Sequence, residues 1–415
     1  MPVPHFPPRP RPGPISDSDP GNTWLGALFA ERHRWHADCK SPRGPVRALG
    51  GNADKYLINP RKIANKRRFV PRILSLEYTM RIAVVCNSEF TGVINRFGQP
   101  YPQPPQPWPP DGRIVDNVLA ALREGGHETL LCQGNKRLLA ALEQFMPPDP
   151  RTGPSGMVFN LAEGIQGEYR FTHVPGMLEM AGVPYTGSSP LGHGLTDDKV
   201  ISKMLMRDSG VPTPNFRVMR RGTESTGDLQ FPLVVKPRRE DNSFGLQVVH
   251  DAAQLRLAIE MIDAQYAQDS LVEEYIEGRE INVALLGNED LEVFPFVEHD
   301  LTQLDTKILT WEAKYLAAAQ PPKLCPAIVG GRLAALLRDI SIATFQACQC
   351  RDYARVDLRI DRSGQPFVLE INSMPGLSRQ SPYVLAAMAA GHSYSSSING
   401  ILDVAHKRYF GHGIQ

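Results

Sequence analysis

Polar side chains recur at every second residue in two short segments near the end of the chain. The first segment carries Arg355, Asp357 and Arg359, and the second carries Glu370 and Asn372. Residues two apart on a strand share a face, so each segment presents its polar groups to one side. If the two strands pair, they form one patch of carboxylates, an amide and a guanidinium. Oxygen ligands on a rigid hairpin suit Mg²⁺, which also binds triphosphate oxygens and water.

The alternative is a solvated hairpin face with incidental salt bridges, and the polar residues taken alone favour it. The intervening residues are apolar and are expected together on the opposite face: Val356, Leu358, Leu369 and Ile371. A hairpin that packs one face on a core favours a built site on its other face. The tight turn expected at Ser373–Gly376 would bring backbone amides near the same site.

Two lysines stand where a phosphate group is often bound. Lys236 ends an apolar strand before the polar loop Arg238–Gly245, and Lys199 opens a helix after Asp197 and Asp198. A lysine there is a point charge for phosphate, and the loop offers backbone N–H and hydroxyl donors. Either lysine alone is more often a solvated surface residue. Neither segment matches the G-x-x-x-x-G-K-[ST] pattern, which excludes a P-loop.

A third polar segment is acidic. We expect strands on both sides of the turn at Glu277–Gly278 to place Glu273 and Glu280 near each other. Carboxylates at such a position can accept hydrogen bonds from ribose hydroxyls or from an exocyclic amine. An exposed acidic turn fits the composition equally well, so both interpretations remain open at this point.

The elements that position these residues follow from the hydrophobic pattern. The first region is expected to form a parallel α/β layer, with strands at 81–86, 127–132 and 157–161 and a helix at 114–123 that stops at Gly125–Gly126. In the second region helices are expected at 199–208, 252–262 and 332–347, and strands at 231–236, 246–250, 270–275 and 281–286. Two pairs of strands, 231–236 with 246–250 and 354–360 with 366–371, are predicted to form hairpins. Ligands gather at the carboxyl ends of the strands in such layers.

Composition narrows the class of protein. The 45 lysines and arginines nearly balance 44 aspartates and glutamates, which gives no electrostatic reason to expect nucleic acid or a membrane as partner. The six cysteines are too sparse for a disulfide framework, and the Cys348–Cys350 pair is better explained by burial than by metal binding. We find no apolar run of membrane-spanning length and no secretory signal, and we expect a cytoplasmic protein. The oligomeric state stays open, a homodimer included.

Residues 1–79 differ from the rest, with a proline-dominated start and an arginine-rich stretch that lacks periodicity. They are expected to be either a disordered basic tail or sequence upstream of a true start at Met80, and we favour the second interpretation. The remaining chain is expected to divide into an N-terminal substrate domain at 80–190, a central subdomain at 191–272 and a C-terminal subdomain at 273–412.

A chain that begins at Met80 is therefore expected to fold and to keep its activity, because the preceding residues lack a core-forming pattern. Soluble yield and turnover of the shortened chain measure this. Insolubility or lost turnover would show that the first 79 residues belong to the fold.

In this order the segments resemble the ATP-grasp superfamily, and most closely the D-alanine–D-alanine ligase family. The resemblance runs from about Met80 to Tyr409 and is densest in Leu178–Ser189, Asp198–Lys203, Val235–Gly245, Trp311–Leu316, Cys325–Ala327 and Val368–Ser381, with Ala390–Tyr394 and Ile401–Leu402 similar to the final helix. It implies an α/β fold with an N-terminal Rossmann-like pre-ATP-grasp domain followed by a two-part ATP-grasp fold. It also implies ATP and two Mg²⁺ ions, or Mn²⁺, as cofactors and small amino acids as substrates.

The resemblance assigns roles position by position. Lys199, Lys236 and Lys314 resemble the lysines that contact phosphates. Asn242 and Ser243 stand where the family has its phosphate and substrate loop. Glu273, Tyr275 and Ile276 are similar to the segment around adenine, and Glu280 to the ribose ligand. Asp357, Glu370 and Asn372 look like the metal ligands. Arg355 and Gly376 resemble the oxyanion donors, Tyr315 the residue that lines the reaction centre, and Ser381 the one that holds the second substrate's carboxylate.

The chain departs from the family pattern where the first substrate is read. The family's H-G-x-x-G-E-D-G loop appears as Glu163–Arg170, with Glu163 in place of histidine and Tyr169–Arg170 in place of the acidic-glycine end. Glu89 is a loose match to the acid that grips the first substrate's ammonium. Arg170 is one candidate partner for Glu163, and a substrate cation is another. ATP chemistry is therefore expected, whereas D-alanine as the substrate is not.

The resemblance implies an ATP-dependent carboxylate–amine ligase that forms a peptide bond through an acylphosphate, with a family role in cell-wall biogenesis. One alternative is an amino-acid or peptide ligase of specialised metabolism with another substrate pair, which the altered loop favours. An ATP-grasp kinase is a second alternative, against which Arg355 and the Ser373–Gly376 turn argue. A non-catalytic ATP-binding protein is a third, and the complete set of metal ligands argues against it.

Overall fold

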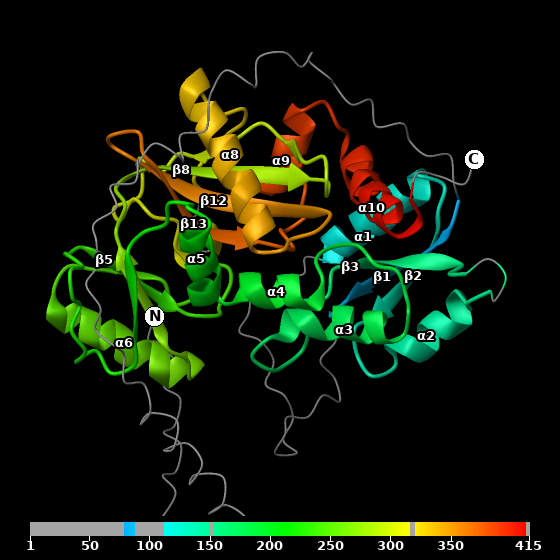
Figure 1. Ribbon diagram of the computed structural model, residues 1–415, viewed down its shortest axis with the longest axis horizontal. Helices are drawn as coiled ribbons and strands as arrows, with labels where there is room; N and C mark the ends of the chain where they lie inside the picture. Colours follow the sequence, from blue (N-terminus) through cyan, green and yellow to red (C-terminus); the bar gives the residue numbers. More distant parts are fainter. Residues whose placement is uncertain (1–78, 88–111, 150, 152, 316–319, 412–415) are drawn as a thin grey trace, which may run out of the picture. The chain divides into compact units, whose positions relative to one another are not determined.

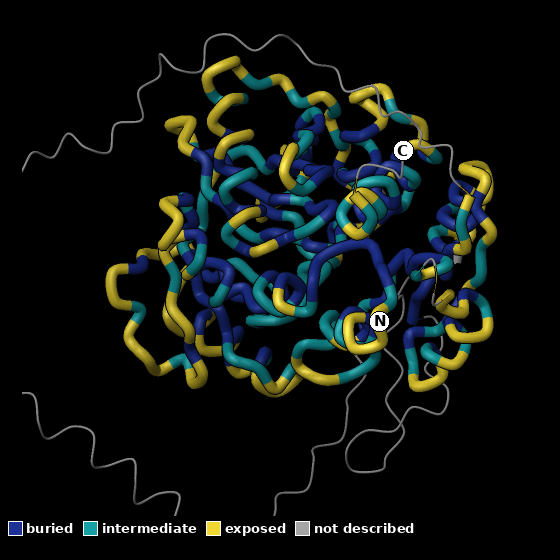
Figure 2. The backbone as a smooth tube through the Cα atoms, turned by 45° about the vertical axis from the view of Figure 1, so that its right-hand side comes forward, coloured by how far each residue is buried: buried dark blue, intermediate teal, exposed yellow. Residues whose placement is uncertain are grey.

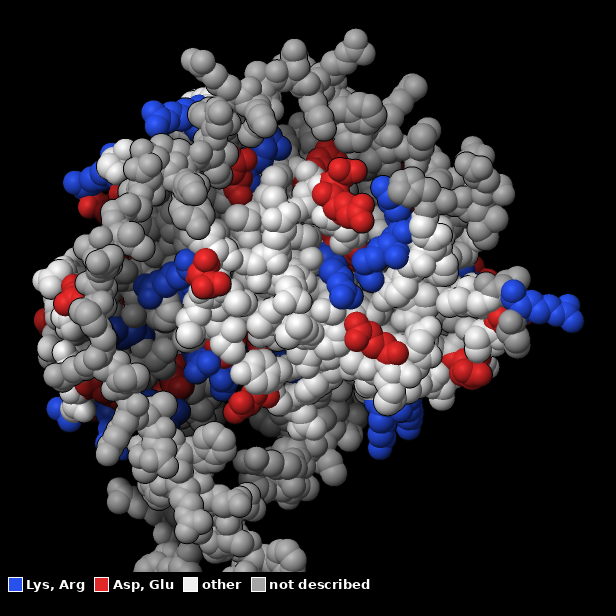
Figure 3. All heavy atoms as spheres, viewed as in Figure 1, with Lys and Arg blue, Asp and Glu red and all other residues white. Residues whose placement is uncertain are grey.

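Three β-sheets organise the part of the chain that the computed structural model describes, namely residues 79–87, 112–149, 151, 153–315 and 320–411 (Figure 1). The expected tail, apart from its last residue, and Glu89 lie outside these residues. The strands at the centre are buried, and exposed residues concentrate on loops and outer helix faces (Figure 2). Basic and acidic side chains are interspersed on the face shown in Figure 3.

The first sheet is parallel and has the order β2-β1-β3, with β1 at Arg81–Cys86, β2 at Glu128–Gln133 and β3 at Gly156–Asn160. Alternate residues of β1 enter two different cores: Ile82 and Val84 pack with α1 (Gly112–Glu124), and Ala83 and Val85 pack with α2 (Leu138–Phe145). Burial on both faces explains the uninterrupted apolar run of β1. The expected strand–helix–strand layer is confirmed.

Four short helical segments lead from the first sheet to the next: η2 at Arg170–Thr172, α3 at His173–Met180, α4 at Pro190–Asp197 and α5 at Lys199–Asp208. The Asp198 carboxylate caps α5 by accepting from the backbone N–H groups of Val200 and Ile201 at 3.0 and 3.1 Å. Gly210 follows α5 in a left-handed conformation with φ of +73°. The predicted helix at 199–208 is confirmed at both ends.

The second sheet is antiparallel and has the order β4-β7-β5-β6, with β4 at Phe216–Met219, β5 at Leu233–Pro237, β6 at Gln247–Val249 and β7 at Ser270–Glu274. The helix α6 (Ala252–Tyr266) packs Leu255, Ile259 and Ile262 into the same core as the sheet. Leu233 pairs with Val249, which confirms the expected hairpin of 231–236 with 246–250.

The third sheet has the order β11-β10-β8-β12-β13, with β9 also paired to β8. Its strands are β8 at Gly278–Leu286, β9 at Glu292–Val293, β10 at Val297–His299, β11 at Lys323–Leu324, β12 at Tyr353–Asp361 and β13 at Pro366–Asn372. One face shares a core with α8 (Gly331–Ala347), and the other shares a core with α9 (Pro382–Ala389) and α10 (Tyr394–Phe410). A short helix, α7, spans Trp311–Tyr315. No helix among the described residues is long and apolar enough to cross a membrane.

The strands β7 and β8 follow one another in the chain but belong to different sheets, so Glu273 and Glu280 are not placed by a simple turn between neighbouring strands. β7 pairs with β4 and β5, whereas β8 pairs with β12 and β10. The expected boundary at residue 272 cuts through β7. In addition, α5 packs on α8 and β13 of the third sheet, so the expected central unit at 191–272 is not one structural layer.

The hairpin of β12 and β13 is confirmed, with one correction. A β-bulge interrupts the pairing at Asp357/Leu358: Glu370 pairs with Asp357, but Val368 rather than Leu369 pairs with Leu358. The extra residue shifts the alternation, so Val368 takes the core position and Leu369 faces the cleft described below. Val356, Leu358 and Ile371 lie in the core as expected.

Candidate active site

A cleft with about 760 Å³ of space, part of it open to solvent, is lined by residues of the second and third sheets, of the helices α5 and α7 and of the connecting loops. Part of its lining is apolar: Val234, Phe244, Leu246, Ile276, Ile308, Leu309 and Leu369. The other part is charged: Lys199, Lys236, Glu240, Glu273, Glu274, Glu280, Lys314, Asp357, Arg359 and Glu370. An apolar wall beside clustered lysines and carboxylates suits a ligand that has a flat apolar part and an anionic part.

Both carboxylates predicted on the hairpin line this cleft. Arg355 holds Asp357 through two hydrogen bonds of 2.7 and 2.8 Å, and the Asn372 amide nitrogen donates to Asp357 at 3.1 Å. Glu370 stands opposite Asp357 in the strand register, and Arg355 stands opposite Asn372. The predicted one-sided polar patch is therefore confirmed as a geometric arrangement.

Asp357 is also positioned by two residues that were not predicted: one contacts Asp357 directly, and the other contacts the first. The Asn282 amide nitrogen donates to Asp357 at 2.6 Å, and His299 Nε2 lies 2.6 Å from Asn282 Oδ1. Burial lowers the pKa of His299 to about 3, so the imidazole is neutral and its Nε2–H donates to Asn282. Only strand pairing brings Asn282 opposite Asp357, so no local signal could have identified it.

The Glu370 carboxylate is surrounded by cations. Lys199 Nζ lies 3.8 Å from Glu370 Oε2. Burial acts to raise the pKa of Glu370, but Lys199, Lys236, Lys314 and Arg355 outweigh it and lower that pKa to about 2. Glu370 is therefore an anion at neutral pH.

Lys236 and Glu273 form a buried ion pair with a second lysine. Glu273 is 2% exposed and lies 2.6 Å from Lys236 Nζ and 2.9 Å from Lys203 Nζ. Lys203 is 0% exposed and also donates to Thr213 Oγ1 at 2.7 Å. Burial lowers the pKa of Lys203 to about 8, and the Glu273 charge limits the fall. Lys203 lies four residues after Lys199, on the same side of α5, which was the signal that could have identified it.

The loop 238–245 closes over one side of the cleft. Lys314 Nζ donates to Ser243 Oγ at 2.8 Å, and the Tyr315 hydroxyl donates to Asn242 Oδ1 at 3.0 Å. The ring of Phe244 stacks on Trp311 with 5.7 Å between centroids. Asn242 and Ser243 both adopt a left-handed conformation, with φ of 55° and 62°. The loop and α7, which the sequence analysis treated separately, are thus in contact.

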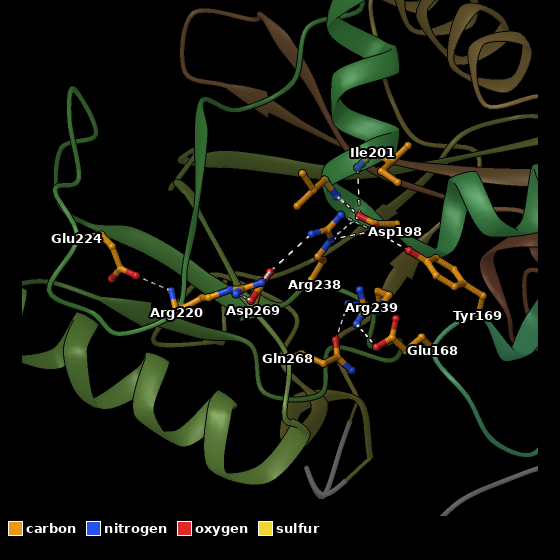
Figure 4. Close-up of polar contacts among 11 residues, drawn as sticks. Glu168, Tyr169, Asp198, Ile201, Arg220, Glu224, Arg238, Arg239, Gln268 and Asp269 are labelled. Atoms are coloured by element: carbon orange, nitrogen blue, oxygen red, sulfur yellow. Dashed lines mark hydrogen bonds and ion pairs between the residues drawn. The ribbon is translucent and has the colours of Figure 1, made fainter. Parts of the chain in front are cut away.

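The same loop also binds the altered segment of the first region (Figure 4). Arg238 Nε lies 2.8 Å from both oxygens of Asp198, which accepts from the Tyr169 hydroxyl at 3.4 Å. A guanidinium nitrogen of Arg239 lies 3.6 Å from a carboxylate oxygen of Glu168. The guanidinium carbon of Arg239 lies over the Tyr169 ring, 5.6 Å from its centroid. Two loops that are distant in sequence are therefore joined by charge-assisted contacts.

Arg170, offered above as a partner for Glu163, forms its ion pair with Asp241 instead, at 3.3 Å. Glu163 is partly exposed, but its Oε2 atom is buried and has no hydrogen-bond partner among the residues described. Burial and the Asp241 charge raise the pKa of Glu163 to about 7, which the Arg170 charge limits. Asp241 belongs to the loop 238–245, which the structure brings beside Arg170 at the start of η2.

Of the residues predicted around the nucleotide, some line the cleft and one does not. Glu280 and Ile276 line the cleft. Tyr275 packs against Arg359 instead, with 5.4 Å between the guanidinium carbon and the ring centroid, and its hydroxyl donates to the Thr306 carbonyl at 3.2 Å. Arg359 was not predicted as a site residue, yet it lines the cleft and donates to the Ile276 carbonyl at 2.9 Å.

Two predicted residues lie in the segment that follows β13. Gly376 is exposed, and a β-carbon added there would meet open space. Ser381 is 9% exposed and caps α9 by accepting from the Val384 N–H at 3.4 Å. Neither residue lines the cleft, so their predicted roles rest on the resemblance.

Comparison with known proteins is consistent with this geometry. The family model described as the D-ala D-ala ligase C-terminus matches residues 205–403. An uncharacterized protein of Sinorhizobium fredii, y4sG, is 79% identical over 335 residues, which cover 81% of this chain and 99% of that protein. The D-alanine–D-alanine ligase of Moorella thermoacetica is 31% identical, over 69% of this chain and 92% of that enzyme.

Among solved structures, the D-alanine–D-alanine ligase of Bacillus anthracis complexed with ATP matches with a TM-score of 0.60 and 23% identity. The match covers 79% of this chain and 98% of that enzyme, which establishes the shared fold. The chain belongs to the D-alanine–D-alanine ligase family of the ATP-grasp superfamily and is an ATP-dependent, amide-bond-forming ligase.

Proposed function

We propose that the chain joins the carboxylate of one amino acid to the amine of another through an acylphosphate. A carboxylate oxygen of the first amino acid attacks the γ-phosphorus of ATP, the bond to the bridging oxygen breaks, and ADP leaves. The amine nitrogen of the second amino acid then attacks the acyl carbon. The acyl C–O bond to phosphate breaks, and the nitrogen loses a proton as inorganic phosphate departs.

The observation that carries this proposal is the convergence of lysines and hairpin carboxylates in one cleft. Lys199, Lys236 and Lys314 line it together with Asp357 and Glu370. Transfer of a phosphoryl group is mostly a task of positioning and of offsetting negative charge, which these cations perform. Arg355 and the Gly376 amide are assigned to the oxyanion that forms at the acyl carbon. Tyr315 and the loop 238–245 exclude water, which would hydrolyse the acylphosphate.

The other end of ATP is assigned to the apolar part of the lining. Ile276 and the neighbouring strand residues are placed around adenine, and Glu280 accepts from the ribose hydroxyls. Glu273 is assigned to hold Lys236 in position, because both of its oxygens lie beside lysines. Ser381, at the start of α9, is assigned to the carboxylate of the second amino acid.

The hairpin residues fit Mg²⁺ in their donor chemistry. Asp357 and Glu370 supply ionisable oxygens, and the Asn372 nitrogen donates to Asp357, which leaves the Asn372 carbonyl oxygen as its acceptor. These three residues would hold the metal, which would offset charge on the phosphate oxygens. Arg355 donates to both Asp357 oxygens in this structure, so its guanidinium stands beside the residues that would hold the metal.

The same residues weigh against the two other classes of function. A non-catalytic ATP-binding protein has no use for Asp357, Glu370 and Asn372 in one register. A kinase has no use for Arg355 beside them. We place the ligase in the cytoplasm, where ATP is available and where its cysteines, which form no disulfide among the described residues, stay reduced.

We further propose that the best substrate pair is not two D-alanines. The support is Glu163, which stands where the family carries histidine, with the unsatisfied buried oxygen described above. A site built around a specific polar contact rejects ligands that cannot make it. A phosphate-release screen against pairs of D- and L-amino acids, with product masses recorded, tests this proposal. A kcat/KM for D-alanine alone as high as for any other pair would contradict it.

Replacing Glu163 by histidine is expected to shift the preferred first substrate and to leave the KM for ATP within about 3-fold. The reason is that Glu163 lies on the first-region loop and does not line the cleft. The measurement is kcat/KM for each pair in the same screen, with the KM for ATP measured in parallel. An unchanged ranking of substrates, or a large rise in the KM for ATP, would count against the assignment.

A further inference from the structure

Asp197, the last residue of α4, is a buried carboxylate that lacks a hydrogen-bond partner. It is 8% exposed, and both of its oxygens are buried without a partner among the described residues. Burying a carboxylate is costly unless a cation or a donor satisfies it. Among the described residues no ion pair to Asp197 lies within 4.0 Å, so Arg170 and Lys199 act on its charge only from a longer distance.

Asp197 shares its charged neighbours with Glu163, and one of these neighbours is Asp241. We call Glu163, Asp197 and Asp241 the acidic cluster. Asp197 and Glu163 both interact electrostatically with Asp241 and with Arg170. Arg170 is already engaged by Asp241 at 3.3 Å, and Lys199 donates to the Glu240 carbonyl and faces Glu370. The cluster therefore holds three carboxylates and one engaged guanidinium, which leaves about two negative charges to be matched once all three carboxylates are ionised.

The acidic cluster adjoins the phosphate side of the cleft. Lys199 and Glu240, which line the cleft, both act on the Asp197 charge. Burial and the Glu163 charge raise the pKa of the Tyr315 hydroxyl, which donates a hydrogen bond to Asn242. A substrate whose carboxylate meets the terminal phosphate of ATP would thus extend its other groups toward the cluster.

We propose that the acidic cluster binds the cationic side chain of the first substrate, so that the acyl donor is a basic amino acid of the lysine, ornithine or arginine kind. This inference rests on the ligase function proposed above. The α-ammonium of any amino acid matches one of the two surplus charges, and a side-chain ammonium or guanidinium matches the other.

The proposal also has a signature in pH. Burial and then the Asp241 charge raise the pKa values of Glu163 and Asp197 to about 7. Both must lose a proton to bind a cation, so kcat/KM for a basic substrate should rise from pH 6 to 8 and then level off. The charged and titratable groups that face the pair are Arg170, Lys199, Glu240, Asp241 and Tyr315.

The first experiment compares basic amino acids with neutral molecules of similar size. Phosphate release is measured with ATP, Mg²⁺ and a fixed second amino acid, using lysine against norleucine and arginine against citrulline in both chiralities. The expected kcat/KM is at least ~100-fold higher for the basic member of each pair, because a buried polar site left unmatched rejects its ligand. Equal values for the members of a pair would overturn the inference and leave the ligase function standing.

The second experiment uses Asp197→Asn. We expect the lysine-to-norleucine ratio of kcat/KM to fall at least ~10-fold and the rise between pH 6 and 8 to weaken. Glu260→Gln is the matched control, because Glu260 is an exposed carboxylate in a surface pair with Arg256 on α6. An unchanged ratio in the Asp197 variant would overturn the inference.

Direct binding keeps the inference testable if no amino-acid pair releases phosphate, a result that would count against the proposed ligase function itself. Calorimetry with ADP present should then detect lysine or arginine and not norleucine, and Asp197→Asn should abolish the signal. A thermal shift caused by Mg²⁺ or Ca²⁺ alone and lost in Asp197→Asn would identify a metal site and overturn the organic-cation assignment.

Discussion

Replacing Glu370 by glutamine is expected to lower kcat at least ~100-fold, about the loss of one strong electrostatic element in a reaction centre. The amide keeps the shape of the side chain and removes a charge that faces Lys199, Lys236, Lys314 and Arg355. Those cations would then lack their central anion, and a metal would lose one of its ionised ligands. ATP-dependent phosphate release under saturating substrates measures the effect.

The matched control for this variant is Asp361→Asn. Asp361 ends the same strand pair at its turn, outside the cleft, and its Oδ1 atom accepts from the Ser363 and Gln365 N–H groups. An amide keeps an acceptor at that atom, so kcat should stay within about 2-fold, as for surface changes away from a site. A near-normal kcat for the Glu370 variant would refute the metal assignment.

Replacing Glu273 by glutamine is expected to lower the free energy of unfolding by about 3–5 kcal/mol, because it leaves a buried cation uncompensated. Lys203 is 0% exposed and Lys236 is 6% exposed, and Glu273 is the carboxylate that both contact. Denaturant midpoints and slopes measure the loss. Adding Lys203→Met to the variant should restore part of it, since the unpaired charge is then removed.

The surface pair of Arg256 and Glu260 provides the comparison. Its side chains are 59% and 55% exposed, so Glu260→Gln should cost less than about 1 kcal/mol. A loss of similar size for the Glu273 variant would mean that the two lysines are solvated through the cleft and that the carboxylate does not hold them.

Local signals sufficed for much of the fold. The strand Arg81–Cys86 and the helix Lys199–Asp208 were predicted with the bounds that the structure shows, because the residues of each segment determine its local structure. The strand is a β-branched run buried on both faces, and the helix has an aspartate cap and a following glycine. The polar face of the hairpin formed by 354–360 and 366–371 followed from the alternation of polar and apolar residues.

Contacts between distant segments could not be predicted in this way. The separation of β7 from β8 depends on partners that lie far along the chain, and a pattern of single strands does not name partners. The bulge that turns Leu369 into the cleft breaks the period on which the prediction rested. The position of Lys203 on the helix could be predicted from the sequence. Its ion pair with Glu273 could not, because only the fold brings the two residues together.

Under the two proposals made above, the loop 238–245 is shared by the ATP site and the site of the first amino acid. Through Ser243 and Asn242 it touches Lys314 and Tyr315 beside the nucleotide cleft, and through Asp241 it touches Arg170 beside the acidic cluster. A ligand that fixes the loop on one side fixes it for the other. The two affinities are then linked by thermodynamics: the factor by which ATP strengthens binding of the first amino acid equals the factor by which that amino acid strengthens binding of ATP. Fusing a reporter to this loop would therefore register either ligand, and loosening it would weaken both by related amounts.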